Sequence, residues 1–241
     1  MTGQAAIVTG AARGFGLAIS SRLMECGVRV IGWDQDPSPI EEDDRFLCVK
    51  KIDITSADAV HAASESALAT AGQIDILINN AGIHGPQVPV EDYPLENWQR
   101  VIAVDLTAVF VCTQAIVPHM KQAGYGRIVT IASQAGKEGL ANTSAYNAAN
   151  FAVDGFTQAL AKEMADHDIT VNSVCPGLTE TSRMDPMGRE DRWNERLKGI
   201  PMNRVGTDEE IGELIGFLCS PRAAYITGQS INVNGGALPE R

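Results

Sequence analysis

A glycine-rich segment near the N-terminus has the composition of a phosphate-binding turn. The run Thr9-Gly10-Ala11-Ala12-Arg13-Gly14-Phe15-Gly16 follows the apolar residues 5–8 and precedes apolar residues at helical spacing. Its glycines permit a tight turn and let the backbone approach a pyrophosphate, whose charge the helix N-terminus stabilises. The alternative is a turn that uses glycine only for its positive φ.

Asp34 makes a dinucleotide the better explanation of this turn. It follows the apolar run 28–33 and lies 18 residues after Gly16. A carboxylate at this place accepts hydrogen bonds from the adenosine ribose hydroxyls and repels a 2′-phosphate. We therefore predict NAD rather than NADP as the cofactor. Arg13 is weak evidence for NADP, because its side chain could equally lie over the adenine or pair with a surface acid.

Strand-like and helix-like segments alternate along the chain and must position these groups. Strands are expected at 5–8, 28–33, 46–49, 74–78, 127–132, 169–174 and 231–233, and helices at 15–26, 57–71, 95–121 and 144–165. This alternation predicts right-handed crossovers and a parallel sheet with helices on both faces. We expect one doubly wound, Rossmann-type α/β domain over residues 1–241, with about seven strands.

Two irregular segments, near residues 82–94 and 177–204, follow predicted strands. Ligands of open α/β sheets bind beyond the carboxyl ends of the strands, so these segments are predicted to form the substrate loops. The second contains apolar residues that suggest a lid or the packing of a short helix: Met184, Met187, Trp193 and Met202.

Composition excludes several kinds of partner. The net charge of −11 weighs against nucleic acid. We find no signal-peptide pattern and no window that approaches the roughly 20 apolar residues of a membrane span, so we predict a cytoplasmic protein without membrane contact. The five cysteines are scattered, and the four histidines lack ligand spacing, so no metal site is expected.

Further motifs follow the glycine turn along the chain. They are Asp53-Ile54, Asn79-Asn80-Ala81-Gly82, Pro176-Gly177, Tyr225-Ile226-Thr227-Gly228-Gln229 and Asn232-Val233-Asn234-Gly235-Gly236. Together with the turn, in order and over essentially the whole chain, they resemble the short-chain dehydrogenase/reductase family. Taken alone, Asp53 could belong to a helix N-cap and Asn79-Asn80 to a turn.

The resemblance implies a set of cofactor-binding residues. Asp53 and Ile54 would frame the adenine, residues 80–82 would pass beside the cofactor, and residues 176–181 would approach the nicotinamide carboxamide. The full set is Gly10, Arg13, Gly14, Phe15, Gly16, Asp34, Asp53, Ile54, Asn80, Ala81, Gly82, Tyr146, Asn150, Pro176, Gly177, Thr179 and Thr181.

Members of this family typically use serine, tyrosine and lysine, supported by an asparagine. Ser133 and Tyr146, 13 residues apart, have the family's spacing. Tyr146 would be the general acid/base that exchanges a proton with the substrate oxygen, and Ser133 would hydrogen-bond the same oxygen. The alternative is structural: Ser133 merely ends a strand, and Tyr146 packs in the core.

Two catalytic positions depart from the family pattern. Asn150 stands where the lysine is expected, and Asp105 stands where the supporting asparagine is expected. A neighbouring ammonium would lower the pKa of tyrosine, whereas an ionised Asp105 nearby would raise it. Each pKa unit corresponds to about 1.4 kcal/mol of bias against tyrosinate. Asn150 can still hydrogen-bond the nicotinamide ribose.

The sequence therefore predicts an NAD-dependent oxidoreductase with an altered proton relay. It would transfer hydride between a secondary hydroxyl or carbonyl compound and the nicotinamide, with Asp105, water or a substrate group replacing the lysine. The alternatives are a redox-neutral lyase or epimerase that retains NAD and uses Tyr146, and a catalytically weak scaffold that binds NAD and a partner subunit.

Neighbouring residues add substrate candidates. His84 should face the cleft, where it could bind or protonate substrate, although it could also be an exposed loop histidine. Gln134 is a further candidate for contact with the substrate. Lys137 could supply the missing positive charge or point to water.

The two long helices predict self-association. They carry exposed-looking small and apolar residues, namely Ala108, Val109, Cys112, Phe151 and Phe156. The family resemblance implies pairing of such helices into a homodimer or homotetramer. A monomer with these residues turned inward is the alternative.

Overall fold

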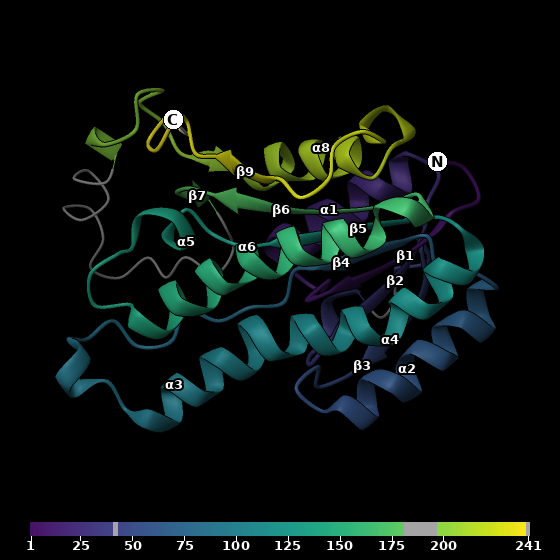
Figure 1. Ribbon diagram of the computed structural model, residues 1–241, viewed down its shortest axis with the longest axis horizontal. Helices are drawn as coiled ribbons and strands as arrows, with labels where there is room; N and C mark the ends of the chain where they lie inside the picture. Colours follow the sequence, from purple (N-terminus) through teal and green to yellow (C-terminus); the bar gives the residue numbers. More distant parts are fainter. Residues whose placement is uncertain (41–42, 181–196, 240–241) are drawn as a thin grey trace.

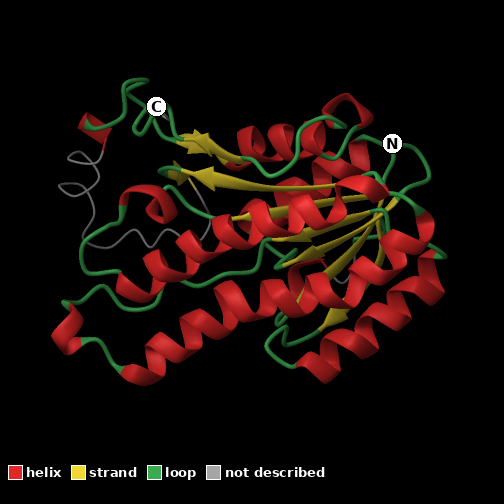
Figure 2. Ribbon diagram, in the orientation of Figure 1, coloured by secondary structure: helices red, strands yellow, loops and turns green. Residues whose placement is uncertain are grey.

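The computed structural model describes residues 1–40, 43–180 and 197–239, and it contains a seven-stranded parallel sheet between two layers of helices (Figure 1, Figure 2). The strand order is β3-β2-β1-β4-β5-β6-β9. The strands are β1 Ala5–Thr9, β2 Arg29–Asp34, β3 Phe46–Lys51, β4 Ile76–Asn79, β5 Gly126–Ile131, β6 Ile169–Pro176 and β9 Ser230–Val233. The predicted doubly wound fold is confirmed.

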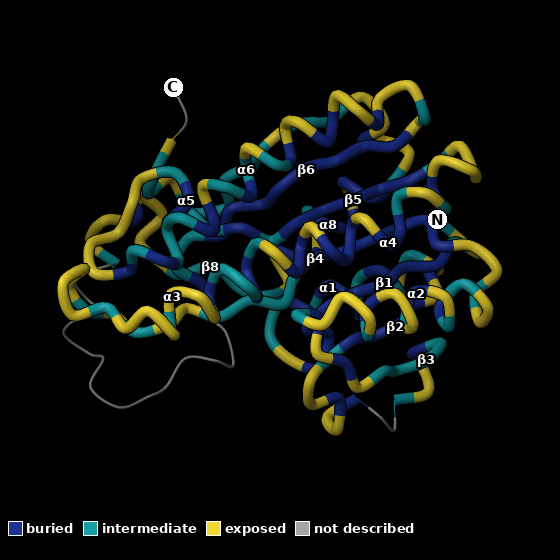
Figure 3. The backbone as a smooth tube through the Cα atoms, turned by 60° about the horizontal axis from the view of Figure 1, so that its bottom comes forward, coloured by how far each residue is buried: buried dark blue, intermediate teal, exposed yellow. Residues whose placement is uncertain are grey.

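Each face of the sheet is covered by its own helices. The main helices of the described chain are α1 Gly14–Glu25, α2 Ala57–Ala71, α3 Leu95–Ile102, α4 Ala108–Ala123, α5 Ala135–Glu138, α6 Ser144–Met164 and α8 Asp208–Leu218. One buried apolar cluster joins the sheet to α2, α4 and α6, and another joins it to α1 and α8. The strands between them are largely buried (Figure 3).

The order of the strands reverses beside β1. From β1 the chain runs outward through β2 and β3, then crosses to β4 on the other side of β1. Ile7 in β1 therefore lies opposite both Ile31 in β2 and Leu77 in β4. A crevice forms beyond the carboxyl ends of the strands at such a switch point. The segments after β1, β2, β4, β5 and β6 all belong to this edge.

The predicted helix over 95–121 is interrupted. A π-helical segment, η3 Ala103–Thr107, separates α3 from α4. This helical region, Leu95–Ala123, is also long and apolar enough to cross a membrane, so our statement that no window approaches such a span is wrong. Its most apolar window is 56% buried within the protein, because α4 packs against the sheet and α2.

The expected exposure of the long helices is corrected in part. Ala108, Val109 and Cys112 are buried, because this side of α4 faces the sheet. Phe151 on α6 is 48% exposed, as expected, and Phe110 on α4 is 47% exposed. Phe156 is partly buried and contacts Phe110 edge-on.

The helix α8 was absent from our sequence prediction. Thr207 caps it: its side chain accepts a hydrogen bond from the Glu210 N–H, and the Glu210 carboxylate accepts one from the Thr207 N–H. This capping box satisfies backbone donors of the first turn and is visible in the sequence. The short strand β8 Gly206–Thr207 lies directly before α8 and pairs with β7 Thr179–Glu180, which follows β6. This pairing brings the two ends of the second substrate loop together.

Candidate active site

The glycine turn between β1 and α1 has the backbone geometry that the sequence predicts. Gly10 and Gly14 have positive φ angles of 65° and 52°. A Cβ at Gly16 would overlap the Gly10 carbonyl oxygen, so only glycine fits there. The N-cap residue Arg13 makes no side-chain capping hydrogen bond, which leaves the first-turn N–H groups of α1 available for an anion. The turn fits a pyrophosphate.

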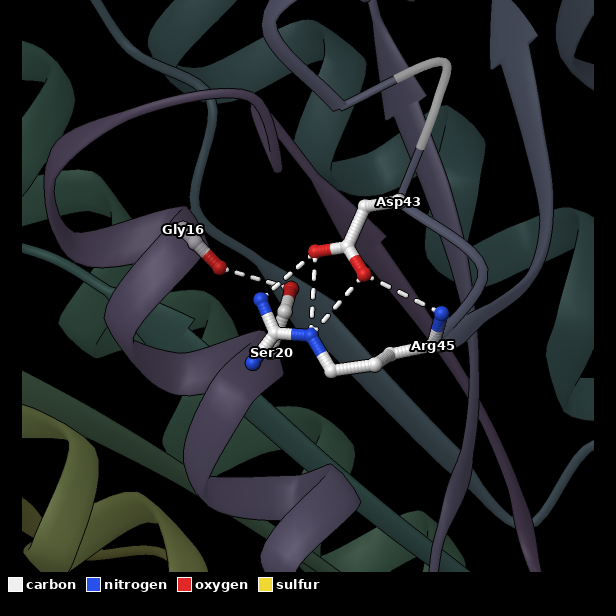
Figure 4. Close-up of polar contacts among 4 residues, drawn as sticks. All are labelled: Gly16, Ser20, Asp43 and Arg45. Carbon is white, nitrogen blue, oxygen red and sulfur yellow. Dashed lines mark hydrogen bonds and ion pairs between the residues drawn. The ribbon is translucent and has the colours of Figure 1, made fainter.

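The first turn of α1 is fixed by internal contacts. Ser20 donates a hydrogen bond from Oγ to the Gly16 carbonyl at 2.7 Å (Figure 4). Phe15 packs against the apolar cluster under α1, so its side chain serves the core and its backbone belongs to the turn. Helix α1 is thereby held with its N-terminus at the crevice.

The loop after β4 is tied to the glycine turn by Thr9 and Asn80. The Thr9 hydroxyl oxygen accepts hydrogen bonds from the N–H groups of Asn80 and Ala81, at 2.9 and 3.1 Å. Asn80 Nδ2 donates to the carbonyls of Thr9 and Gly10. Thr9 was not among our predicted site residues, although its place directly before Gly10 is a readable signal. The Asn80 side chain therefore builds the turn rather than reaching outward.

Asp34 ends β2 beside the same turn. Its Oδ2 accepts a hydrogen bond from the Ala12 N–H at 3.0 Å, and its Oδ1 accepts one from the Asp36 N–H at 3.0 Å. Arg13 pairs with Asp36, with 3.1 Å between Nη2 and Oδ2. Of the alternatives for Arg13, the structure thus contains the pairing with a surface acid. Asp36 was not among our predicted site residues, although its place two residues after Asp34 could have indicated that it lies beside the turn.

The segment before β3 carries a second arginine–carboxylate pair. Arg45 donates from Nε to Asp43 Oδ1 at 2.8 Å and from Nη2 to Asp43 Oδ2 at 2.6 Å (Figure 4). These hydrogen bonds hold the pKa of Asp43 below its ordinary value. The Arg45 charge is thus matched locally by Asp43.

Asp53 and Ile54 follow β3 as predicted. Asp53 Oδ1 accepts hydrogen bonds from Thr55 N–H at 3.0 Å and Thr55 Oγ1 at 2.7 Å, and these bonds lower its pKa. The N-cap of α2 is Ser56, so Asp53 belongs to the turn before the cap. Ile54 is buried in the core cluster.

Tyr146 lies in the first turn of α6, and Ser133 follows β5. The Ser133 hydroxyl oxygen accepts a hydrogen bond from the Ala135 N–H at 3.1 Å, which fixes its side chain at the start of α5. Gly136 in α5 lies so close to α6 that a Cβ would come within 2.8 Å of the Asn150 backbone. The segment carrying Ser133 is thus packed directly against the helix that carries Tyr146 and Asn150.

Asn150 is 5% exposed and bonded within its own helix. Its Nδ2 donates a hydrogen bond to the Tyr146 carbonyl, four residues earlier, at 2.8 Å. Asp105 is 8% exposed and lies in the π-helical segment, where Oδ1 accepts a hydrogen bond from the Ile83 N–H at 2.8 Å. Asp105 therefore anchors the loop after β4, just beyond Gly82. Its charge, added to the effect of burial, raises the pKa of Tyr93.

His84, the residue after Ile83, lies against Tyr146. The two ring centroids are 4.4 Å apart, and the ring planes are inclined by 42°. His84 is exposed, as the loop-histidine alternative required, yet it also faces the predicted acid/base. The structure brings together two residues that are 62 positions apart in the sequence.

The carboxyl end of β6 lies beside the segment that follows β5. Pro176 is its last residue, and its carbonyl accepts a hydrogen bond from the Gln134 N–H at 3.0 Å. A Cβ at Gly177 would come within 2.6 Å of Asn234, so glycine is needed for this approach. The Gln134 side chain donates to Glu138 at 2.6 Å, and Thr179 is buried.

Four predicted residues of the second substrate loop lie outside the described residues, namely Thr181, Met184, Met187 and Trp193. Met202, which is described, is 65% exposed.

Lys137 lies on the β9 side of this arrangement. Its Nζ donates a hydrogen bond to the Ser230 carbonyl at 2.6 Å, and the Ser230 hydroxyl donates to Asp154 on α6 at 2.8 Å. Lys137 therefore does not simply point to water, and its role as the missing positive charge stays a prediction. Within residues 1–40, 43–180 and 197–239, no group of three or more His, Cys, Asp or Glu side chains could hold a metal.

Known proteins are similar to this chain in sequence and fold over nearly their whole length. The sequence model of the family described as enoyl-(acyl carrier protein) reductase matches residues 10–237. The 2-dehydro-3-deoxy-L-rhamnonate dehydrogenase (NAD(+)) of Sphingomonas sp. strain SKA58 is 37% identical over 237 residues, covering 97% of this chain and 95% of that protein. The 3-oxoacyl-[acyl-carrier-protein] reductase FabG of Vibrio cholerae serotype O1 is 35% identical over 240 residues, covering 98% of each.

A solved structure agrees with these relatives. The crystal structure of a putative short-chain alcohol dehydrogenase from Sinorhizobium meliloti 1021 superposes with a TM-score of 0.92 at 33% identity. The match covers 98% of this chain and 97% of that one.

Proposed function

The chain belongs to the short-chain dehydrogenase/reductase family, and we propose that it is an NAD-dependent enzyme acting on a secondary hydroxyl or carbonyl compound. Its relatives are dehydrogenases and reductases, so it is an oxidoreductase that uses a nicotinamide cofactor and a small-molecule substrate. The choice of NAD, the class of substrate and the altered proton relay are the parts that we propose.

The observation that carries the proposal is the fixed carboxylate of Asp34. Two backbone N–H groups, from Ala12 and Asp36, hold its two oxygens beside the glycine turn. Each carboxylate oxygen can accept more than one hydrogen bond, so Asp34 can still receive the adenosine ribose hydroxyls. A 2′-phosphate at the same place would meet a fixed negative charge.

The chain's own residues would handle the substrate oxygen. Ser133 orients it, and Tyr146 accepts the hydroxyl proton in oxidation or returns it in reduction. When bound, the nicotinamide supplies the acceptor for the hydride that leaves the carbinol carbon.

The proton relay must work without the lysine. Asn150 is neutral, and its amide already bonds to the Tyr146 carbonyl. Asp105 bonds to the Ile83 N–H and so holds the loop that carries His84. We propose that the proton passes between Tyr146 and water, with His84 as the imidazole placed beside that path, 4.4 Å from the Tyr146 ring.

The test uses purified protein, NAD+ and a panel of secondary alcohols that includes 3-hydroxyacyl thioesters and hydroxy acids of deoxy sugars. We expect NADH formation that rises from about pH 7 to about pH 10, because no lysine at position 150 assists ionisation of Tyr146. Absence of NADH from every alcohol at every pH would contradict the proposal and favour the redox-neutral enzyme or the weak scaffold.

We also propose that the protein works in the cytoplasm as a homo-oligomer, a dimer or a tetramer. Support comes from Phe110 and Phe151, large apolar side chains about half exposed on the adjacent helices α4 and α6. Size-exclusion chromatography with light scattering tests this, and a monomer at micromolar concentration would contradict it.

A further inference from the structure

Arg13 and Asp36 form an oriented ion pair next to Asp34. Arg13 Nη2 lies 3.1 Å from Asp36 Oδ2, while Asp36 Oδ1 accepts a hydrogen bond from Ser38 Oγ at 2.7 Å. The hydrogen bond from Ser38, together with that from Arg13, lowers the pKa of Asp36. Asp36 is therefore ionised at neutral pH, and both of its oxygens are engaged.

One short stretch of backbone positions both carboxylates. The Asp36 N–H donates to Asp34 Oδ1 at 3.0 Å, so the turn that fixes Asp34 also places Asp36. Arg13 follows Ala12, whose N–H bonds to the other oxygen of Asp34. Arg13 has an extended backbone at the N-cap of α1, and its side chain meets the end of β2.

Arg13 is the one charged residue of the turn Thr9 to Gly16. A guanidinium at the adenosine ribose would be a good ligand for a 2′-phosphate, because arginine binds phosphate oxygens in a forked geometry. The sequence thus carries a group suited to NADP and, in Asp34, a group suited to NAD. The pairing of Arg13 with Asp36 resolves that conflict.

We propose that Asp36 is a second determinant of cofactor choice, which acts by holding Arg13 away from a 2′-phosphate. This inference rests on the proposed function, in which the nucleotide binds at the glycine turn. Asp34 repels the phosphate directly, and Asp36 neutralises the cation that would otherwise attract it. Arg13 must leave its pair with Asp36 before it can bind the 2′-phosphate of a NADP-type dinucleotide.

Other charged side chains lie in and around β3, and they have to be distinguished from Arg13 as the group that would attract a 2′-phosphate. Arg45 is bound by both oxygens of Asp43, and Asp53 is bound by Thr55. Lys51 is exposed and lies opposite Asp34 in the β2–β3 register, so it is the competing cation that an experiment must separate from Arg13.

The Arg13 and Asp36 side chains are 45% and 63% exposed, so their attraction is weakened by solvent. The pair therefore biases the choice of cofactor rather than forming a barrier. Loss of the pair should change the affinity for the phosphate-bearing dinucleotide and hardly change the affinity for NADH.

The experiment measures the Kd of NADH and of NADPH directly, by quenching of protein fluorescence, for the intact chain and its variants. We expect the wild type to prefer NADH. Asp36→Asn should tighten NADPH binding roughly tenfold, the value of one freed charged hydrogen-bond donor, and change NADH binding by less than about threefold. In an Arg13→Ala background, Asp36→Asn should leave the Kd of NADPH unchanged.

Glu25→Gln is the matched control. Glu25 is an exposed carboxylate that pairs with Arg22 on the same helix α1, and its substitution changes the net charge equally. An Asp36→Asn variant that does not tighten NADPH binding overturns the inference. So does an equal gain in Glu25→Gln, or a gain that persists without Arg13, because either result assigns the effect to overall charge or to Lys51.

The same titrations distinguish the role of Asp36 from the NAD preference itself. A wild type that prefers NADH, with no response to Asp36→Asn, overturns only the role of Asp36. A wild type that prefers NADPH or binds neither nucleotide contradicts the NAD preference of the proposed function and, with it, this inference.

Discussion

The glycine-turn region and the region around Tyr146, for which we propose proton transfer, lie at the same edge of the sheet, but they depend on different parts of the chain. At the turn, the contacts are made largely by backbone: Gly10, Gly14 and Gly16 shape it, and N–H groups hold the Asp34 carboxylate. Around Tyr146, by contrast, the chemistry depends on the identity of side chains.

The proposed function places both departures from the family pattern, Asn150 and Asp105, in the second region. Asn150 and Asp105 both make satisfied hydrogen bonds, so the local structure accommodates them. Relative to the family pattern, a cationic side chain is absent at position 150, and a carboxyl group stands at position 105. Geometry can be preserved while the electrostatics that favour tyrosinate are lost.

The largest effect, a loss of NADH affinity, should come from adding a side chain in the glycine turn. Gly16→Ala places a Cβ on the Gly10 carbonyl oxygen, so the turn must open, and we expect the NADH affinity to fall by about a thousandfold. Titration with NADH measures this, together with thermal unfolding.

Gly155→Ala in α6 is the control for the turn, because a Cβ there meets nothing within 4 Å. It should bind NADH normally and unfold at an equal or higher temperature, since alanine favours helix over glycine. A Gly16→Ala protein that binds NADH within about tenfold of wild type would show that the backbone shape is not decisive.

Removing the hydroxyl of Tyr146 should separate the two regions. Tyr146→Phe keeps the ring that packs against His84 but cannot exchange a proton, so we expect kcat to fall by about a hundredfold. The Kd of NADH should change by less than about fivefold, because the glycine turn is untouched and only the hydroxyl of one expected cofactor-binding residue is removed. Comparable losses in both quantities would mean that the regions are not independent.

Restoring a cation should repair the proton-transfer region. Asn150→Lys places an ammonium one helical turn from Tyr146, and we expect activity near neutral pH to rise about tenfold, with the pH profile shifted downward. Asn150→Gln serves as the neutral control and should not shift the profile. If the lysine variant gains nothing, the relay works by a route that does not need a cation at this position.

A smaller effect, on the pH dependence of stability, should come from Asp208 at the end of the second substrate loop. Burial, aided by the charges of Glu209 and Glu180, raises the pKa of Asp208 to about 6. The folded protein thus binds this proton more tightly than the unfolded chain does. The free energy of unfolding should therefore decrease as the pH rises from about 4 to about 6.

Asp208→Asn should remove this pH dependence and stabilise the protein above pH 6 by about 1 kcal/mol, a value reduced for solvent screening. Urea unfolding at pH 5 and pH 8 measures the difference. Asp58→Asn, an exposed acid in the first turn of α2, controls for the helix dipole. Equal pH dependence in the wild type and Asp208→Asn would contradict the assignment.

The sequence determined the order of strands and helices, the glycine turn and the position of Asp34, because hydrophobic periodicity and glycine spacing are local signals. From their spacing it also predicts catalytic roles for Ser133 and Tyr146, and these stay predictions. The capping box of α8 was equally local and was overlooked. The break at Ala103–Thr107 was not foreseen, because hydrophobic periodicity does not distinguish a π-helical segment from the α-helix around it.

Only the tertiary structure decided which partners these residues meet. His84 lies against Tyr146, Arg13 pairs with Asp36, and Lys137 bonds to the Ser230 carbonyl. Each of these contacts joins segments that are distant in the chain. Side-chain direction depends on how helices and loops pack, and neither the composition nor the spacing of residues contains that information.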